Sequence, residues 1–593
     1  MTVRRFGPEI TASGTTLRLW APAAKTVDAM VEGQRHSMTR SEDGWFAVGV
    51  DGAAAGSRYR FRIDDELDVP DPASNFQPED VAGPSQIIDH DAFTWQAESW
   101  RGRPWHETVL LECHVGAFSP EGTYRGLIDK LDHVVETGIT AIELMPLADF
   151  PGRWNWGYDG VLWFAPDHTY GSPDELKQLI DSAHLRNIMV FLDVVYNHFG
   201  PEGNYLGRYA PQFFKAAATP WGAAIDYSIP EVRAFAIENA VHWLRDYRFD
   251  GLRLDAVHAL AEPGGLAMLQ ELSEAVGVVA SESGRHIHLV LENDDNRASL
   301  LDPDTEIPSG RYRAQWNDDY HHAWHVLLTG ETHGYYSDYA SGPQQMIAQM
   351  LAQGFAYQGE PSRHRGGKPR GEKVGGLSPA AFVNFLQNHD QIGNRAFGDR
   401  LGLSASPIAI EAALAITLLA PMPPLLFMGE DWGARTPFPF FCDFDGALAE
   451  AVRQGRRREF AQSYATSAQD VPDPLAPSTF QAAKLDWAAR DGEGLARHQL
   501  VKALLDVRRT EIVPRLRGAS FAHSEFLQSN ILTAQWTLGD DQTLALIANL
   551  SGEITTRGHA AFHGRSIWGG EAPERLPPWS VFWSIGAGPA PPI

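Results

Sequence analysis

Cysteine and long apolar stretches are both scarce in this sequence of 593 residues. The two cysteines, Cys113 and Cys442, lie in apolar surroundings, so a disulfide framework is not expected and a reducing compartment fits best. No stretch of about 18 uncharged apolar residues is present, and the basic N-terminus MTVRRFGPEITASG is not followed by an apolar run. We therefore expect a soluble, cytoplasmic protein without a membrane span.

Positively charged residues are also scarce relative to negatively charged ones. The 49 Lys and Arg residues are outnumbered by 75 Asp and Glu residues, which gives a formal net charge of −26. Such a surface repels phosphate backbones and anionic lipids, so neither nucleic acid nor a membrane is an expected partner. Aromatic residues are abundant by contrast, with 18 tryptophans, and their flat apolar faces suit stacking on sugar rings as well as core packing.

The pattern of apolar residues divides the chain into three regions. Residues 1–95 contain short alternating strands such as TLRLWAP and GWFAVGV, which indicate an N-terminal β-sandwich. In residues 96–512, apolar runs of strand length alternate with helical stretches, which is typical of repeated βα units. Residues 513–593 return to strand patterning and predict a small C-terminal β-sandwich domain.

Eight apolar runs in the middle region predict a (β/α)8 barrel. They are TVLLECHV, ITAIELMP, NIMVFLDVV, FDGLRLDAV, HIHLVLEN, YRAQWND, AFVNFLQNH and PPLLFMGE. The sixth, YRAQWND, is polar for a strand that is buried on both faces. We therefore expect an α/β fold with a central barrel flanked by two β domains.

Polar and charged side chains follow four of these runs at the point where each strand ends. They are Asp193, Asn197 and His198 after the third run, Arg253, Asp255 and His258 after the fourth, Glu292 after the fifth, and Asn388, His389 and Asp390 after the seventh. Any one of them could be a helix cap or a structural polar residue. Because barrel strands end at one face, the set forms a carboxylate cluster whose mutual repulsion a function would explain.

Two of these carboxylates suit glycoside cleavage, which needs a nucleophile at the anomeric carbon and a proton donor to the leaving oxygen. Arg253, two residues before Asp255, lies on the same strand face and can hold that aspartate ionised, so Asp255 is predicted to be the nucleophile. Glu292 follows an apolar run, and partial burial should raise its pKa and keep it protonated. Glu292 is therefore predicted to be the general acid and then the base.

Four motifs, DVVYNH, GLRLDAVH, LVLEND and FLQNHD, resemble in this order the signature regions of the α-amylase superfamily of glycoside hydrolases. The resemblance implies that Asp255 is the nucleophile, Glu292 the acid/base and Asp390 a third carboxylate that grips ring hydroxyls. It also implies a first sugar subsite lined by Arg253, His198, His389 and Tyr158, the tyrosine of WNWGYDG serving as a stacking platform. The early segment LRLWAPAAKTVDAMV resembles the N-terminal carbohydrate-binding sandwich of branching and debranching members.

Phrases such as RWNWGYDGVLWFAP, AQWNDDYHHAWH and FLQNHDQIGNRAFGDR are similar to those of superfamily members that cut the α-1,4 bond next to the terminal trehalose of maltooligosyltrehalose. Branching enzymes more usually read GYQ and HDEV where this chain has GYDG and HDQI. The resemblance implies release of trehalose and a maltooligosaccharide with retention, and a functional pairing with the synthase that forms the substrate. One alternative is a glucan branching enzyme or α-1,4-glucanase, and another is a noncatalytic glycan-binding protein.

Recognition of trehalose is expected on the leaving-group side of Glu292, in three loops. The substrate-binding candidates there are Trp156, Tyr205, Trp221, Asp319 and His321, with His258 beside them, and the same loops contain Trp154, Tyr209, Phe213, Phe214, Asp294, Asp295 and Asp318. Any single aromatic among them could instead belong to the core. Segment 355–379 is long, polar and glycine-rich, so we expect it to border the active-site mouth and to be less ordered than the barrel.

No metal ion and no cofactor are expected. Asn197 corresponds to a position that helps to bind calcium in many amylases, but the following stretch FGPEGNYLGRYAPQFF does not resemble their acidic calcium loop. Asn197 is therefore predicted to be a hydrogen-bonded structural residue. In the N-terminal region, Trp20 and Trp45 are expected to pack against the barrel rather than to bind glucan.

Overall fold

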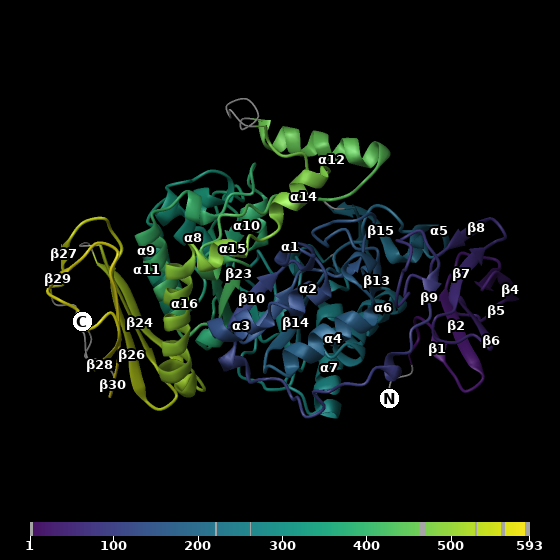
Figure 1. Ribbon diagram of the computed structural model, residues 1–593, viewed down its shortest axis with the longest axis horizontal. Helices are drawn as coiled ribbons and strands as arrows, with labels where there is room; N and C mark the ends of the chain where they lie inside the picture. Colours follow the sequence, from purple (N-terminus) through teal and green to yellow (C-terminus); the bar gives the residue numbers. More distant parts are fainter. Residues whose placement is uncertain are drawn as a thin grey trace.

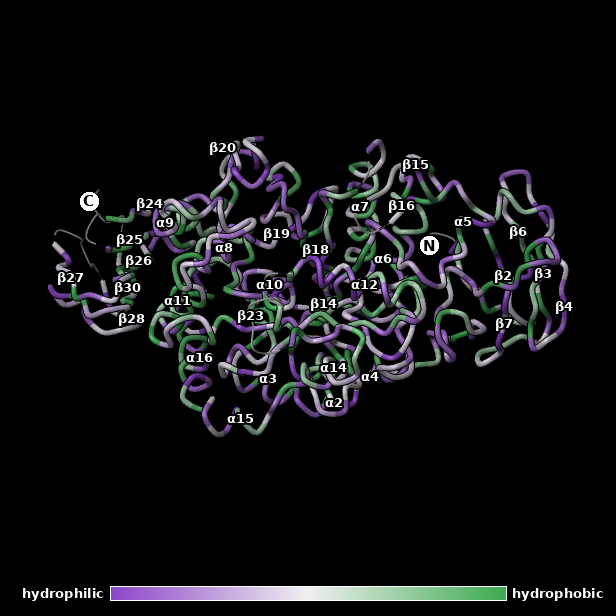
Figure 2. The backbone as a smooth tube through the Cα atoms, turned by 90° about the horizontal axis from the view of Figure 1, so that it is seen from above, coloured by the Kyte–Doolittle hydropathy of each residue, from purple (hydrophilic) through white to green (hydrophobic). Residues whose placement is uncertain are grey.

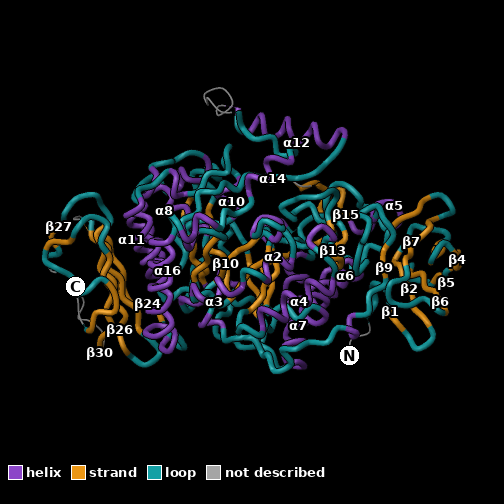
Figure 3. Tube along the Cα trace, in the orientation of Figure 1, coloured by secondary structure: helices purple, strands orange, loops and turns teal. Residues whose placement is uncertain are grey.

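Three regions follow one another along the long axis of the molecule in a computed structural model (Figure 1). The structure describes residues 4–219, 222–260, 262–461, 470–527, 530–558 and 564–587. Strands gather at both ends and in the centre, and helices surround the central group (Figure 3). The view from above gives the same order of N-terminal, central and C-terminal regions (Figure 2).

The N-terminal region is a sandwich of two antiparallel sheets. One sheet has the order β1 (Glu9–Ile10), β2 (Gly14–Trp20), β6 (Trp45–Asp51) and β5 (Thr39–Arg40). The other has the order β4 (Gln34–Ser37), β3 (Val27–Val31), β7 (Arg58–Ile63) and β8 (Leu67–Val69). Buried and more exposed residues alternate along β2 and β7, as expected for strands with one face on a core.

The central region is a closed barrel of eight parallel strands, as the sequence predicted. In order around the barrel they are β10 (Leu110–Cys113), β11 (Ala141–Leu144), β14 (Met189–Val194), β17 (Gly251–Leu254), β18 (His288–Leu291), β19 (Ala314–Trp316), β22 (Phe382–Phe385) and β23 (Pro424–Phe427). Parallel pairing of β23 with β10 closes the ring. All residues of these strands are buried, which explains why the runs read as nearly continuous apolar segments.

The polar sixth strand, β19, has a physical explanation in its side-chain contacts. Gln315 donates to the carbonyl oxygen of Asn293 and to the side chain of Asn296, so its buried amide nitrogen has two partners. Trp316 presents its ring to the Arg253 guanidinium at 4.1 Å. This strand therefore contributes polar and aromatic support to its neighbours, and its composition reflects that role.

Helices cover the outside of the barrel (Figure 3). The longer ones are α4 (Pro173–His184), α6 (Pro230–Asp246), α7 (Gly265–Ser283), α8 (Asp318–Thr329), α9 (Pro343–Gln353), α11 (Pro407–Leu419) and α16 (Leu495–Val507). Helix α4 begins with a capping box in which Ser172 and Glu175 satisfy each other's backbone N–H groups. Among the described residues, no helix combines the length and the apolar character needed to cross a bilayer.

The C-terminal region is an antiparallel β domain. Its larger sheet has the order β24 (Ser520–Leu527), β25 (Ile531–Thr537), β26 (Gln542–Asn549), β30 (Val581–Ala587) and β28 (Arg565–Trp568), and β27 (Thr555–Thr556) pairs separately with β29 (Arg575–Leu576). Strand β24 contacts helix α9, and Phe521 meets Phe382 of the barrel with ring centroids 6.0 Å apart. The predicted fold class, a (β/α)8 barrel between two β domains, is confirmed.

The N-terminal sandwich shares its core with the barrel. Trp20 is 6% exposed and its ring lies 5.7 Å from that of Phe213, while Phe6 bridges Trp45 and Phe235 of α6. The prediction that these tryptophans pack is confirmed for Trp20, and Trp45 is half-buried against Phe6. Helix α12 (Gly446–Glu459) projects beyond the barrel at the top of the view in Figure 1.

Candidate active site

Arg253 is the centre of the charged cluster at the carboxyl ends of the strands. It lies in β17, and its side chain has 0% exposure. Its guanidinium donates at 2.7 Å to Asp193 and at 2.8 Å to Asp255, and lies 3.8 Å from Glu292. One buried cation thus joins the ends of β14, β17 and β18, and it reduces the repulsion between three carboxyl groups.

Asp255 follows the last residue of β17 and is held on both sides. Its Oδ1 accepts from Arg253, and its Oδ2 accepts from the Asn197 side-chain amide at 2.8 Å. The backbone N–H of Asp255 donates to the carbonyl oxygen of Val194, which fixes the start of the turn. Asn197 is therefore a hydrogen-bonded residue as predicted, and its partner is the carboxylate of Asp255 itself.

Ala256 turns the chain so that its N–H faces Glu292. This residue has a φ of 42° and a ψ of 46°, a left-handed conformation that is strained for a side chain other than glycine. Its N–H donates to Glu292 Oε2 at 2.5 Å, while Glu292 N–H donates to the carbonyl oxygen of Leu254. The strained turn therefore links the two carboxyl groups through the backbone, and nothing in the sequence pattern indicated it.

Burial is the largest influence on Glu292. Burial raises the pKa of this carboxyl, Asp255 and Asp390 raise it further, and Arg253 and His258 oppose the shift. The side chain is 14% exposed, so it remains accessible from the mouth of the barrel. Glu292 therefore has the environment of a carboxylic acid that keeps its proton, as the sequence predicted.

Asp193 and Tyr158 form a buried pair next to Arg253. The Tyr158 hydroxyl donates to Asp193 Oδ2 at 2.6 Å, and Arg253 donates to the same oxygen. Burial raises the pKa of Asp193 to about 7, although Arg253 and Tyr158 favour its ionised form. The Tyr158 ring stacks on His389 with centroids 5.0 Å apart, and His198 contacts the Tyr158 carbonyl oxygen at 3.0 Å.

His389 is held by a glutamate that the sequence analysis did not single out. Glu112 of β10 accepts from His389 N–H at 3.0 Å and contacts the His389 ring nitrogen Nδ1 at 2.5 Å. Although burial lowers it, Asp390 and Glu112 raise the pKa of His389 to about 9. Asp390 lies 3.5 Å from the same ring, and its side chain is 46% exposed. Glu112 could have been recognised as a candidate from the sequence, because it is a charged residue inside the apolar run TVLLECHV.

Three of the outer substrate-binding candidates lie in the core. Trp156 is 3% exposed, stacks on Phe438 and donates its indole N–H to the Pro439 carbonyl oxygen. His321 is 1% exposed and contacts the Leu386 carbonyl oxygen and the Tyr336 hydroxyl. The prediction that these two residues contact the sugar directly is therefore corrected. Their polar atoms and ring faces already contact protein, so they support the site from within the core.

Asp319 is likewise corrected from a sugar ligand to an anchor. It has 0% exposure, and its oxygens accept from Asn296, from the N–H groups of Ala356 and Tyr357 and from Arg370. Its neighbour Asp318, at the first turn of α8, is only half-buried. Burial and the charges of Glu292 and Asp294 raise the pKa of Asp318 well above its usual value, so Asp318 is the residue of this pair that lies near the catalytic candidates.

The second candidate loop faces the N-terminal sandwich. Tyr205 precedes α5 (Leu206–Tyr209) and is half-buried, and the Tyr209 carbonyl oxygen accepts from Ala23 N–H. Phe213 contacts Trp20 as described above. These aromatic side chains belong largely to the interface between two domains, and Trp221 lies outside the described residues.

Segment 355–379 borders the mouth, as predicted, through a small hairpin of β20 (Glu360–Pro361) and β21 (Pro369–Arg370). Arg365, between these strands, donates to Asp295 at 2.7 Å and to the Asp294 carbonyl oxygen at 2.9 Å. Arg370, in β21, lies 3.1 Å from the Asp294 carboxylate. His258 accepts from Asp294 N–H at 3.3 Å. From the sequence, this segment was expected to be less ordered than the barrel. The ion pairs, which that expectation did not consider, attach the hairpin to the loop that follows Glu292.

Three family models match parts of the chain. Residues 5–75 match carbohydrate-binding module 48, described as the isoamylase N-terminal domain, and residues 84–218 match the α-amylase catalytic domain. Residues 519–583 match a domain of unknown function. The order of the three matches agrees with the order of the sandwich, the barrel and the C-terminal β domain.

Characterised relatives and solved structures extend this similarity over most of the chain. A malto-oligosyltrehalose trehalohydrolase of Deinococcus radiodurans is 42% identical over 84% of this chain and 82% of its own. One of Saccharolobus solfataricus is 39% identical over 82% of this chain and 84% of its own. A putative α-amylase of Salmonella typhimurium has a solved structure that superposes with a TM-score of 0.92 at 42% identity, covering 98% of this chain and 99% of its own.

A pullulanase of Paenibacillus barengoltzii superposes with a TM-score of 0.72 over 99% of this chain and 96% of its own, but at 18% identity, so it supports the fold alone. The trehalohydrolases, by contrast, match at about 40% identity over more than four fifths of both chains. The strand-end motifs and the cluster around Arg253 lie in the closed barrel of this chain. The chain belongs to the malto-oligosyltrehalose trehalohydrolases, a family of the α-amylase superfamily.

Proposed function

We propose that this chain is a retaining glycoside hydrolase that cleaves the α-1,4 bond next to the terminal trehalose of maltooligosyltrehalose, releasing trehalose and a maltooligosaccharide. The observation that carries the proposal is the arrangement of Asp255 and Glu292 around the buried guanidinium of Arg253. The substrate is supported by the names of the relatives, and the glycosidase class by the α-amylase catalytic-domain match.

Asp255 acts as the nucleophile in this proposal. Hydrogen bonds from Arg253 and Asn197 to its two oxygens fix the orientation of the carboxyl group. The carboxylate attacks the anomeric carbon of the glucosyl unit as the bond from that carbon to the leaving oxygen breaks. A covalent glycosyl-enzyme results, and the anomeric configuration is inverted once.

Glu292 acts first as the acid and then as the base. Because burial and the charge of Asp255 favour its protonated form, it can deliver a proton to the leaving oxygen as trehalose departs. The ionised Glu292 then takes a proton from water, whose oxygen displaces Asp255 from the anomeric carbon. The second inversion gives net retention and restores both carboxyl groups.

The first sugar subsite is formed by the groups above these two carboxyls. Asp390, with its side chain 46% exposed, accepts hydrogen bonds from ring hydroxyls, and the buried His198 and His389 position Tyr158 through its carbonyl oxygen and its ring. Tyr158 presents an aromatic ring that is backed by His389. A ring held by stacking on one side and by carboxylate contacts on the other is oriented for attack by Asp255.

Trehalose is recognised on the leaving-group side of Glu292. Its α,α-1,1 linkage and lack of a reducing end require polar partners that a plain maltosyl group leaves unpaired. Asp318 lies near both Glu292 and Asp294, and Arg365 donates to the Asp294 carbonyl oxygen, so these residues supply donors and acceptors at that side. His258, which contacts the Asp294 backbone, completes the same edge.

The product chemistry also indicates a partner reaction. A maltooligosaccharide with a terminal trehalose must be formed by an enzyme that converts its reducing-end linkage, so this chain is proposed to act after such a synthase. A reducing, cytoplasmic location is supported by Cys113 and Cys442, which are both buried and free.

The test is a comparison of kcat/KM for maltotriosyltrehalose and for maltopentaose, which have the same number of glucosyl units. We expect a ratio well above one, with free trehalose as a product of the first substrate. A ratio near one, or accumulation of α-1,6 branches, would reject the trehalohydrolase proposal in favour of a glucanase or branching enzyme. Binding of both sugars without turnover would indicate a glycan-binding protein.

A further inference from the structure

Asp149, Asp167 and His168 form a cluster away from the proposed catalytic carboxyls, at the base of the loop that carries Tyr158. Asp149 ends β12 (Ala148–Asp149), and the other two follow β13 (Leu162–Pro166), its antiparallel partner. Each of the three offers a ligand atom, and these atoms lie within 4.8 Å of one another. The pairing of β12 with β13 therefore brings the two ends of one loop together at a set of potential metal ligands.

Asp149 has no partner that accounts for its burial. Its side chain has 0% exposure, and neither carboxylate oxygen accepts a well-formed hydrogen bond from the described part of the chain, although the backbone N–H of His168 lies near enough to oppose the rise in its pKa. Burial and the nearby Asp80 raise the pKa of Asp149 well above its usual value. Among the residues that the structure describes, no Lys or Arg side chain forms an ion pair with the half-buried Asp80 or with the buried Asp149 and Asp167, and His168 is the basic side chain beside Asp149.

Asp167 is oriented as metal-bound carboxylates usually are, by hydrogen bonds from outside the site. The N–H and the hydroxyl of Thr169 donate to its Oδ1 at 2.8 and 2.5 Å, and Phe150 N–H donates to Oδ2 at 3.1 Å. These contacts fix the side chain, and they leave a further lone pair on Oδ2, which among the described residues accepts only from Phe150. His168 has an unpartnered Nδ1 that lies 3.7 Å from Asp149 Oδ1.

We infer that Asp149, Asp167 and His168 bind one Zn²⁺ ion, with water as the fourth ligand. In a tetrahedral site with bonds of about 2.1 Å, ligand atoms are roughly 3.4 Å apart, so the distance of 3.7 Å between Asp149 and His168 needs little adjustment. The imidazole nitrogen favours a transition metal over Ca²⁺ or Mg²⁺, which prefer oxygen ligands. His168 is 27% exposed and provides a path for entry of the ion.

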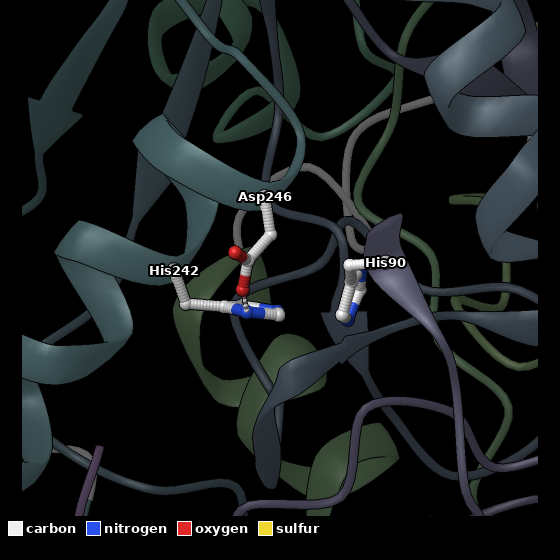
Figure 4. A group of neighbouring side chains, drawn as sticks. All are labelled: His90, His242 and Asp246. Atoms are coloured by element: carbon white, nitrogen blue, oxygen red, sulfur yellow. Dashed lines mark hydrogen bonds and ion pairs between the residues drawn. The ribbon is translucent and has the colours of Figure 1, made fainter. Parts of the chain in front are cut away.

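Two other clusters satisfy the same distance limit and fit a metal less well. In the group of His90, His242 and Asp246, His242 contacts Asp246 with one ring nitrogen and the Phe164 carbonyl oxygen with the other (Figure 4). Asp246 also pairs with Arg4, whose charge repels a metal ion. In the third group, His133 already pairs with Asp431 at 2.7 Å, and both side chains are closed to solvent.

The zinc ion would clamp the base of the loop between Asp149 and Leu162, within which Tyr158 reaches Asp193. No metal ion was expected from the sequence, where only the calcium position at Asn197 was weighed; the inference of a zinc ion at Asp149, Asp167 and His168 departs from that expectation at a different place in the fold. This inference does not depend on the proposed substrate, because zinc binding can be measured without turnover.

The test is zinc binding to the full-length protein after treatment with a chelator, by calorimetric titration with ZnCl2 and by elemental analysis. We expect one Zn²⁺ per chain and a higher melting temperature in its presence. Asp149→Asn and His168→Gln should each weaken zinc binding by more than the ~10–100-fold that loss of an outer partner costs. His90→Gln, in the cluster of Figure 4, is the matched control and should bind zinc as the unchanged protein does.

Failure of the unchanged protein to bind one equivalent of zinc would overturn the inference, as would equal affinity in Asp149→Asn. A rise in the melting temperature of Asp149→Asn with no response to zinc in either protein would also overturn it, because the carboxyls would then be stable as a protonated pair. If Asp149→Asn does not fold, His168→Gln decides the question, since its side chain is partly exposed.

Discussion

Arg253 carries its charge in a position that is closed to solvent, with three carboxyl groups around it. A buried cation of this kind is stable only when its partners are fixed, and the same partners include both proposed reacting groups. Asp255 is held by two hydrogen bonds, whereas Glu292 is held by a backbone N–H and is influenced mainly by burial. The two carboxyls that face Arg253 thus differ in their hydrogen-bond partners, and burial raises the pKa of Glu292.

At this scale we predict that Asp255→Asn and Glu292→Gln each lower kcat by at least ~10², because a nucleophile or a general acid is lost. The product should retain its configuration, and the two carboxyl groups should lie about 5–5.5 Å apart in the substrate complex. NMR of the newly formed anomer measures the first, and a crystal structure of the complex measures the second. If either variant folds and keeps near-normal turnover, the residue replaced in it does not have the role assigned to it.

The pH profile provides a control within the same prediction. Because Glu292 must be protonated in the free enzyme and its pKa is raised, kcat/KM should fall as the pH rises through that pKa. Glu292→Gln cannot lose a proton at this position, so its residual activity should lack that alkaline decline. A decline of the same midpoint in Glu292→Gln would assign the titration to another group.

At the scale of elements, the hairpin of β20 and β21 connects the mouth to α8 and to the loop after Glu292. Arg370 lies between Asp294 and the buried Asp319, while Arg365 pairs with Asp294 and Asp295. Ion pairs from the turn of the hairpin and from β21 therefore fix its position against the barrel. The charge arrangement of the leaving-group side therefore depends on a segment far from Glu292 in the sequence.

We predict that Arg365→Ala lowers kcat/KM for maltotriosyltrehalose about tenfold or more and leaves maltopentaose nearly unchanged. The reason is that Asp294 loses a charge-assisted partner at the side where trehalose is proposed to bind. Steady-state kinetics with both substrates measures the effect. Arg363→Ala, an exposed position in the same hairpin, is the control; equal losses for the two substrates would make Arg365 structural only.

At the scale of the whole molecule, three regions share packed interfaces. The sandwich contacts the barrel through Trp20 and Phe213, and the C-terminal sheet contacts it through Phe521 and Phe382. Arg508, which is 1% exposed, donates to the carbonyl oxygens of Leu418, Ala420 and Met422 and so ties the end of α16 to α11 and the residues after it. The domains are therefore expected to unfold together.

For this reason Trp20→Ala should lower the melting temperature of the entire chain, since truncation of a buried aromatic to alanine costs about 3–5 kcal/mol. Differential scanning calorimetry is the measurement, and a single transition is expected before and after the change. Trp20→Phe keeps an aromatic ring against Phe213 and should lose less stability. A separate early transition, with the main one unchanged, would mean that the sandwich is stable on its own.

The sequence by itself determined the barrel, its flanking β domains and the residues at the strand ends. Strand length and apolar periodicity are local properties, and the carboxyl ends of parallel strands must meet at one face, so Asp255, Glu292 and Asp390 could be grouped without coordinates. The spacing of Arg253 and Asp255 likewise fixed their common direction, because side chains two residues apart in a strand share a face.

Tertiary structure alone decided which of the outer candidates remain accessible. From the sequence, three residues were predicted to contact a sugar from loops, namely Trp156, Asp319 and His321. Contacts with segments distant in the sequence bury all three. The pattern of residues in the sequence also did not predict the contact between Glu112 and His389 or the strained turn at Ala256. Burial and hydrogen bonding depend on residues far apart in the chain, which is why local sequence identifies the chemical groups and only the fold decides which of them can meet a substrate.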